Sequence, residues 1–131
     1  MVKNKFVADY QMNTSRSVVF PYLSTASGLS EWFADDVTID DDKVFDFIYE
    51  GVDHYAKIVA LRSNHSVKFE FFDPKHPEES DRSYVEFRIE ENELTQTLFI
   101  KVIEYSDTFD DDAQETIWEG LINNLKEIIG G

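Results

Sequence analysis

Clustered carboxylates are the first candidates for chemistry in this sequence. They occur as Asp35-Asp36, Asp40-Asp41-Asp42, Glu78-Glu79-Ser80-Asp81, Glu90-Glu91 and Asp110-Asp111-Asp112. Hard cations such as Ca²⁺ bind grouped carboxylates, but none of these runs has the alternating acids, the Gly and the closing Glu of an EF-hand loop. Such charge runs are typical of solvated turns, and Asp110 to Asp112 fits a helix start, where Asp accepts hydrogen bonds from free N–H groups. The sequence therefore predicts no metal site.

The three histidines, His54, His65 and His76, are the candidates for acid–base chemistry. His65 and His76 fall at a predicted turn and in a predicted loop, whereas His54 begins a predicted strand and is expected near the sheet interior. The chain has no Cys, no paired His at metal spacing, no Gly-x-Ser-x-Gly elbow and no phosphate-binding loop. Because a lone His without a partner is not a catalytic site, we expect no catalytic residue and no cofactor.

Aromatic residues are more informative, since the chain has 11 Phe, 6 Tyr and 2 Trp. Nine of them point by their spacing at one interior: Trp32, Phe33, Phe45, Phe47, Tyr49, Phe69, Phe71, Phe87 and Trp118. Each aromatic side chain buries about 150–250 Å², so together they dominate the predicted core.

The elements that position these residues follow from hydrophobic periodicity. Alternation predicts strands over 5–12, 36–40, 44–50, 54–63, 67–72, 85–89 and 94–105. In the strand over 54–63, Tyr55, Val59 and Leu61 are expected on one side. Two short helices are predicted between the first two strands. A long C-terminal helix is predicted from a wide apolar stripe, expected to be buried against the sheet: Ile117, Trp118, Leu121, Ile122, Leu125, Ile128 and Ile129. Short turns between strands favour an antiparallel meander.

Charge and length limit the classes of protein. With 12 basic and 27 acidic residues the net charge is −15, which argues against nucleic acid and anionic membrane surfaces as partners. No apolar run is long enough to span a membrane, and the N-terminus has no apolar core of a signal peptide. We therefore predict a cytoplasmic protein without membrane insertion, folded as one domain over residues 1–131.

Three stretches of the chain resemble one known family, in that family's order. Val19 to Thr25 with Gly28 to Phe33 resembles its pair of short helices ending in Trp-Phe. Phe45 to Gly51, Lys57 to Val59 and Val67 to Phe71 resemble its central strands, and Trp118 to Lys126 resembles its C-terminal helix. The sequence is thus similar to the helix-grip fold of the START-like superfamily, and within it to bacterial relatives of the activator of the heat-shock-chaperone ATPase.

The resemblance implies an α+β fold in which a curved antiparallel sheet of about seven strands wraps around the C-terminal helix. The order would be strand, two short helices, six strands and long helix. It also implies a cavity between sheet and helix. The chain is too short for the lipid-enclosing lids of larger members, and no polar constellation matches the catalytic sites of the cyclase relatives.

We predict that this cavity binds a hydrophobic or amphipathic, lipid-like small molecule. The predicted ligand-binding residues are Trp32, Phe33, Phe45, Phe47, Tyr49, Phe69, Phe71, Phe87, Trp118 and Ile122. The candidate polar groups of the cavity are Tyr49, Tyr10, His54 and Arg62.

Two other functions stay open. Because complementary fields speed association, the charge of −15 suits a basic protein partner, as in a co-chaperone-like interaction domain. The third is a cyclase-type enzyme with His54, Tyr49 and Arg62 as acid–base or orienting groups.

Overall fold

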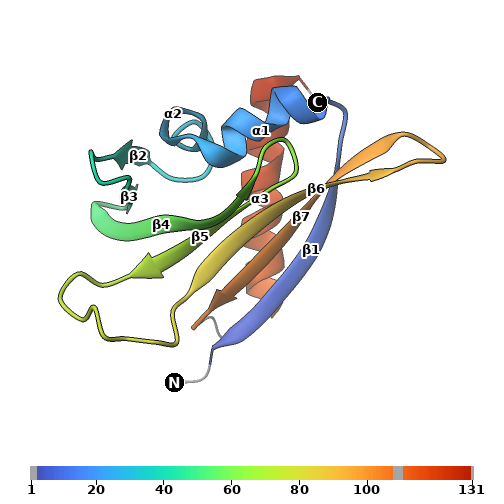
Figure 1. Cartoon of the computed structure of the whole chain (residues 1–131). Coiled ribbons are helices and arrows are strands. Elements are labelled where there is room, and N and C mark those ends of the chain that lie inside the picture. Colours follow the sequence, from blue (N-terminus) through green and yellow to red (C-terminus); the bar gives the residue numbers. More distant parts are fainter. Residues whose placement is uncertain (1–2, 108–110, 131) are drawn as a thin grey trace.

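One curved sheet of seven antiparallel strands and a long C-terminal helix make up most of the molecule (Figure 1). The computed structural model describes residues 3–107 and 111–130. In chain order the elements are β1 (Asn4–Met12), α1 (Arg16–Ser24), α2 (Ala26–Leu29), β2 (Asp36–Ile39), β3 (Phe45–Tyr49), β4 (Val52–Arg62), β5 (Ser66–Phe72), β6 (Tyr84–Asn92), β7 (Thr97–Ser106) and α3 (Asp111–Ile129). This order confirms the predicted α+β helix-grip architecture.

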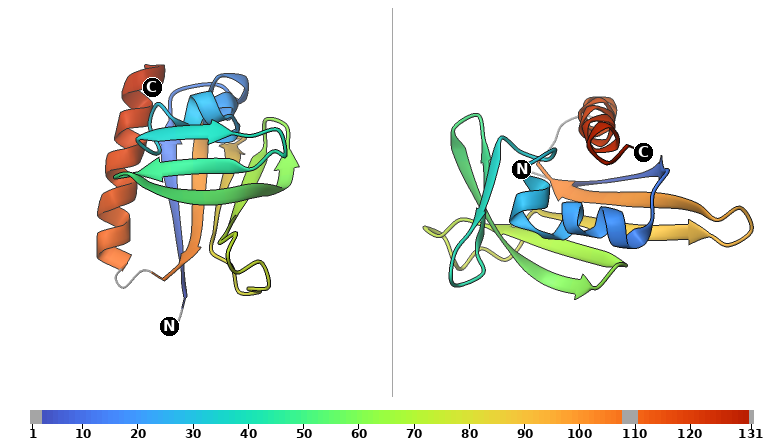
Figure 2. Two further views of the ribbon diagram at one scale, coloured as in Figure 1. Left: turned by 90° about the vertical axis from the view of Figure 1, so that its left-hand side faces the viewer. Right: turned by 90° about the horizontal axis from the view of Figure 1, so that it is seen from above.

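The sheet begins and ends with the strands that flank the short helices. Its order is β1-β7-β6-β5-β4-β3-β2, so β1 pairs with the last strand and β2 forms the far edge. The sheet curls strongly, and β2, β3 and β4 run across the direction of β1 and β7 (Figure 2). Helix α3 packs against β1, which leaves its other flank facing the curled part of the sheet.

Strand alternation places the apolar core where the periodicity predicts it. Phe6 and Met12 of β1 are buried, with Ala8 and Tyr10 packed against the same core. In the centre of the sheet, Phe87 of β6 is opposite Val67 of β5 and Val102 of β7, and all three are fully buried. The inner face of the sheet is therefore apolar along β5, β6 and β7.

Strand β4 departs from the predicted pattern. Its register with β5 shifts between Ile58 and Ala60, as in a β-bulge. Tyr55 is opposite Phe72, whereas beyond the shift Leu61 is opposite Val67. Because an extra residue exchanges the two faces of a strand, the expectation that Tyr55, Val59 and Leu61 share one side is wrong.

The stripe of α3 is only partly buried, which corrects the prediction for this helix. Trp118, Ile122 and Leu125 are buried, but Ile117 is 53% exposed and Ile128 is also exposed. The backbone of α3 lies closest to β1, and from there Trp118 reaches Glu104 of β7 and the Phe87 ring of β6, while Ile117 and Ile128 stay outside these contacts. Asp111 and Asp112 occupy its first turn, as predicted, whereas Asp110 lies outside the described residues.

Helices α1 and α2 are joined by a tight corner that sets the position of the Trp-Phe pair. The Oγ1 of Thr25 accepts a hydrogen bond from the Gly28 N–H at 3.0 Å. Gly28 lies so close to α1 that an added Cβ would be 2.7 Å from the Tyr22 Cα. Trp32 donates from Nε1 to the Tyr22 carbonyl at 2.8 Å, which turns its ring into the core.

Candidate binding cleft

A cleft of about 750 Å³ lies between the curled sheet and the first half of α3. Its apolar wall is made of Phe33, Phe47, Phe71, Val85, Ile117, Trp118 and Leu121. Polar side chains from β3, β4, β7 and the β5–β6 loop form its rim. The cleft therefore combines a continuous aromatic and aliphatic wall with an entrance lined by titratable groups.

Phe33 is the hub of the aromatic wall. Its ring centroid is 5.4 Å from that of Phe47 and 5.7 Å from that of Trp118. It also contacts Trp32 at 5.5 Å and Phe87 at 6.0 Å, in edge-on geometry. Aromatic rings at such distances and angles attract each other beyond simple burial, so Phe33 joins the cleft wall to the aromatic core behind it.

The structure divides the predicted ligand-binding residues into two groups. Phe33, Phe47, Tyr49, Phe71, Trp118 and His54 line the cleft. Trp32, Phe45, Phe69, Phe87 and Ile122 are buried in the core outside the cleft lining, and Arg62 lies at the opposite end of β4 from His54. The three residues considered for a cyclase-type site therefore do not converge: His54 and Tyr49 line the cleft, and Arg62 does not.

Tyr10, the remaining polar candidate, lies elsewhere. It lines a second hollow of about 520 Å³ between β1 and α3. Its hydroxyl is buried and finds no hydrogen-bond partner within the described part of the chain. Burial raises the pKa of Tyr10, and the charges of Glu119 and Glu115 raise it further.

Glu104 of β7 ties α3 to the sheet at the edge of the cleft. Its Oε1 accepts hydrogen bonds from Trp118 Nε1 at 2.7 Å and from the buried amide of Gln114. Its Oε2 accepts a hydrogen bond from Ser106 Oγ at 3.1 Å. One carboxylate thus orients the ring of Trp118 that forms part of the cleft wall. Sequence periodicity missed this role, because Glu104 reads as an ordinary polar position of a strand.

His54 and the neighbouring acids form the rim at the β3–β4 hairpin. His54 Nδ1 lies 3.2 Å from the Phe47 carbonyl oxygen, and its backbone N–H donates to Asp46 Oδ1 at 3.2 Å. Burial raises the pKa of Asp46, as do a hydrogen bond with Asp53 and the Asp53 charge, although the His54 contacts oppose this shift. The hairpin therefore presents a pair of interacting carboxyl groups beside the cleft.

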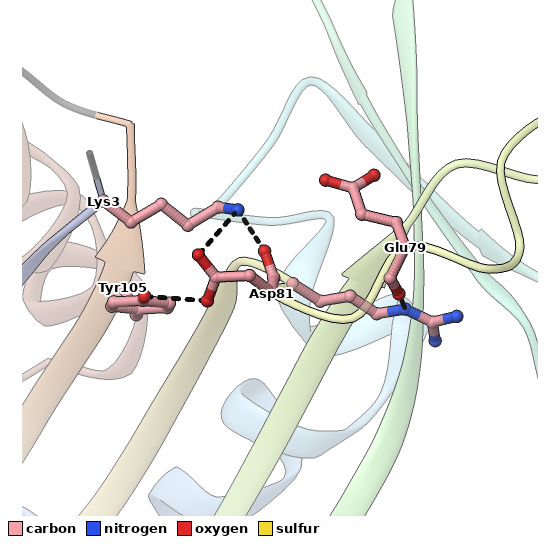
Figure 3. A network of polar contacts seen from close by, with 5 residues as sticks. Lys3, Glu79, Asp81 and Tyr105 are labelled. Atoms are coloured by element: carbon pink, nitrogen blue, oxygen red, sulfur yellow. Dashed lines mark hydrogen bonds and ion pairs between the residues drawn. The ribbon is translucent and has the colours of Figure 1, made fainter. Parts of the chain in front are cut away.

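The β5–β6 loop is anchored at the other end of the cleft by residues far apart in sequence. Figure 3 shows Lys3 and Tyr105 converging on Asp81. Tyr105 donates its hydroxyl to Asp81 Oδ1 at 2.8 Å, and the Lys3 ammonium is 3.7 Å from Oδ2 and also donates to the Asp81 carbonyl. The hydrogen bond to Asp81 raises the pKa of Tyr105, with burial and the Asp81 charge acting in the same direction.

Neither a metal site nor a membrane-spanning helix is found in the part of the chain that the structure describes. Within residues 3–107 and 111–130, no three His, Asp or Glu side chains gather closely enough to hold a metal ion. Among the described helices, none combines the length and apolar composition that a membrane span needs.

A curled seven-stranded sheet with a cleft under its C-terminal helix defines the helix-grip class of proteins. A family model of START-like superfamily domains matches residues 1–131, and the chain belongs to this superfamily. Among curated proteins, none is detectably similar to it in sequence.

Several solved structures share the fold over nearly the whole chain. An Aha1 protein from Colwellia psychrerythraea, solved as a dimer, has a TM-score of 0.74 at 20% identity, with 96% of each chain covered. A protein from Bacteroides fragilis has a TM-score of 0.61 at 29% identity, with 98% of this chain and 92% of that chain covered. A protein from Mesorhizobium loti has a TM-score of 0.75 at 12% identity, with 97% of each covered. The predicted START-like fold is thus confirmed, and the likeness to the Aha1 protein is a likeness of fold.

Proposed function

We propose that this chain is a small START-like binding module that holds a hydrophobic or amphipathic molecule in the cleft between the sheet and α3. The observation that carries the proposal is the cleft itself, with its volume of about 750 Å³ and its aromatic wall. Pockets for small molecules are concave, mostly apolar and about 300–1,000 Å³ in volume. The cleft has this size and this lining.

Part of the apolar wall is still exposed to solvent. A ligand that covers this surface therefore binds with a favourable contribution to the free energy. Ile117 is 53% exposed, and Phe33 and Phe71 are only partly buried. Removing apolar surface from water is favourable by roughly 25 cal/mol per Å². A ligand seated against these three side chains would complete a core that α3 leaves open.

The neutral apolar dye N-phenyl-1-naphthylamine tests this proposal by its increase in fluorescence on binding. We expect Ile117→Ser to weaken dye binding several-fold, because Ile117 lines the cleft. Val59→Ser is the matched control, since Val59 is 50% exposed but is not part of the cleft lining. Failure of the folded wild-type protein to bind the dye, or equal weakening by both substitutions, would contradict the proposal.

The second candidate function is a co-chaperone-like interaction with a basic protein. It is favoured by the net charge of −15 and by the likeness to an Aha1 protein, which extends to fold alone. Exposed charges lose most of their mutual influence beyond about 8–10 Å at physiological ionic strength. Binding to such a partner should therefore weaken steeply with added salt, whereas binding of an uncharged apolar molecule in the cleft should not.

A further inference from the structure

We propose that the cleft selects an amphipathic molecule whose polar head is positively charged, such as a long-chain amine. This inference rests on the proposed binding function of the cleft and specifies the ligand class.

The titratable lining of the cleft is predominantly acidic. The carboxylates in the lining are Asp53, Asp73, Glu79, Glu104 and Asp107, and the cations are Lys3 and Arg82. Besides His54 and the tyrosines, the lining thus carries five carboxylates against the two cations Lys3 and Arg82. Since low-dielectric walls focus the field of the charges that line a cleft, a cationic head is attracted to this entrance and an anionic head is repelled.

Both basic groups are already engaged with the protein. Lys3 is bonded to Asp81, and its side chain is only 10% exposed. Arg82 donates from Nε to the Glu79 carbonyl at 3.0 Å and from Nη2 to the Pro77 carbonyl at 2.8 Å, and its Nη1 is 3.4 Å from Glu70 Oε1. A fatty-acid carboxylate would have to displace these contacts before it gained an ion pair of its own.

Four carboxylates of the lining are exposed, namely Asp53, Asp73, Glu79 and Asp107; Asp53 belongs to β4 and Asp107 directly follows β7. Asp53 shares a hydrogen bond with Asp46, and the charges of the two carboxylates repel each other. Its charge also raises the pKa of the neighbouring Tyr55 phenol. A cation placed beside Asp53 would relieve this repulsion, whereas an anion would increase it.

Decylamine, decanol and decanoate test the inference, because they share one alkyl chain and differ in the charge of the head group. Each is titrated against the dye N-phenyl-1-naphthylamine bound to the full chain at neutral pH and low salt. We expect the amine to bind more tightly than the alcohol, and about tenfold more tightly than the carboxylate, which corresponds to about 1.4 kcal/mol. The amine's advantage should shrink in about 0.5 M NaCl, where charges are screened.

Substitutions that remove charges from the rim identify the groups responsible for the preference for the amine. The double variant Asp53→Asn with Asp107→Asn should lower the ratio of amine to carboxylate affinity, with a much smaller effect on decanol affinity because decanol carries no charge. Glu93→Gln, in the exposed turn between β6 and β7, should change neither. Decanol binding reports directly that each variant still has a folded cleft.

The possible failures are distinguishable. If decanoate binds as tightly as decylamine while all three compete with the dye, the cationic preference is overturned and the binding function stands. If dye and all three compounds fail to bind the folded protein, the proposed function itself is overturned. Equal amine selectivity in the double variant would also overturn the assignment to Asp53 and Asp107.

Discussion

Tyr105 provides a pH-dependent test at the scale of single residues. Its hydrogen bond to Asp81 raises its pKa above the ordinary value of 10.0, because the folded state favours the neutral phenol. This hydrogen bond stabilises the folded state fully at pH values below the pKa of Tyr105 in the unfolded chain. The stabilisation is lost as the pH rises through the raised pKa of Tyr105 in the folded state. The difference between wild type and Tyr105→Phe in phenolate absorbance should therefore show a tyrosine that ionises above pH 10.

Asp81→Ala supplies the companion measurement. Alanine at this position accepts no hydrogen bond and carries no charge, so the pKa of Tyr105 should fall toward its ordinary value. An unchanged titration of Tyr105 in the Asp81→Ala variant would show that the bond to Asp81 is not the main cause of the shift.

Sequence periodicity predicted which aromatic residues face the interior, but it could not predict which of them line the cleft. Phe47 and Phe69 have the same alternating signature, yet Phe47 lines the cleft and Phe69 is buried outside its lining. Phe69 is packed between the rings of Phe45 and Phe47, a tertiary contact that no local pattern encodes. Lys3, Asp81 and Tyr105 could not be grouped either, because their contact spans three separate segments of the chain.

At the scale of elements, the corner between α1 and α2 fixes the position of the aromatic wall. Gly28→Ala should destabilise the protein by about 1–3 kcal/mol, because the added methyl group would overlap the backbone of Pro21 and Tyr22. Gly120→Ala on α3 is the matched control. Nothing lies within 4 Å of its added Cβ, so the better helix propensity of Ala should stabilise the chain by about 1 kcal/mol.

Urea denaturation measures both glycine variants on one scale. The two substitutions are chemically identical, so their opposite signs would isolate the packing at the corner. Equal effects of the two on the free energy of unfolding would contradict the close approach of α2 to α1. A Gly28→Ala protein that still folds should also show altered Trp fluorescence, since Trp32 bonds to Tyr22 at this corner.

Element order and type were predictable because each rests on local periodicity. The order of strands and helices agrees from β1 to α3. Two features were not: the bulge in β4, which changes its faces after Ile58, and the exposure of Ile117 on α3. The bulge depends on pairing with β5, and the exposure depends on α3 resting on β1, so both come from tertiary contacts rather than from the segments themselves.

For the molecule as a whole, the net charge of −15 should both destabilise the fold and attract a cationic ligand. One salt titration separates these two effects. Like charges repel in the folded state, so screening them should stabilise the fold. Raising NaCl shortens the Debye length from about 10 Å at 0.1 M to about 3 Å at 1 M. The melting temperature should therefore rise by a few degrees across this range, with KCl of equal ionic strength giving the same rise.

Over the same salt range, decylamine should bind more weakly even as the protein becomes more stable. The two trends diverge because screening removes both the repulsion between the carboxylates and their attraction for a cationic head. A melting temperature that falls with salt would mean that ion pairs such as Lys3 with Asp81 and Arg82 with Glu70 outweigh the excess of acids. If amine binding is insensitive to salt, contacts with the aromatic wall supply the free energy of binding and the rim charges do not.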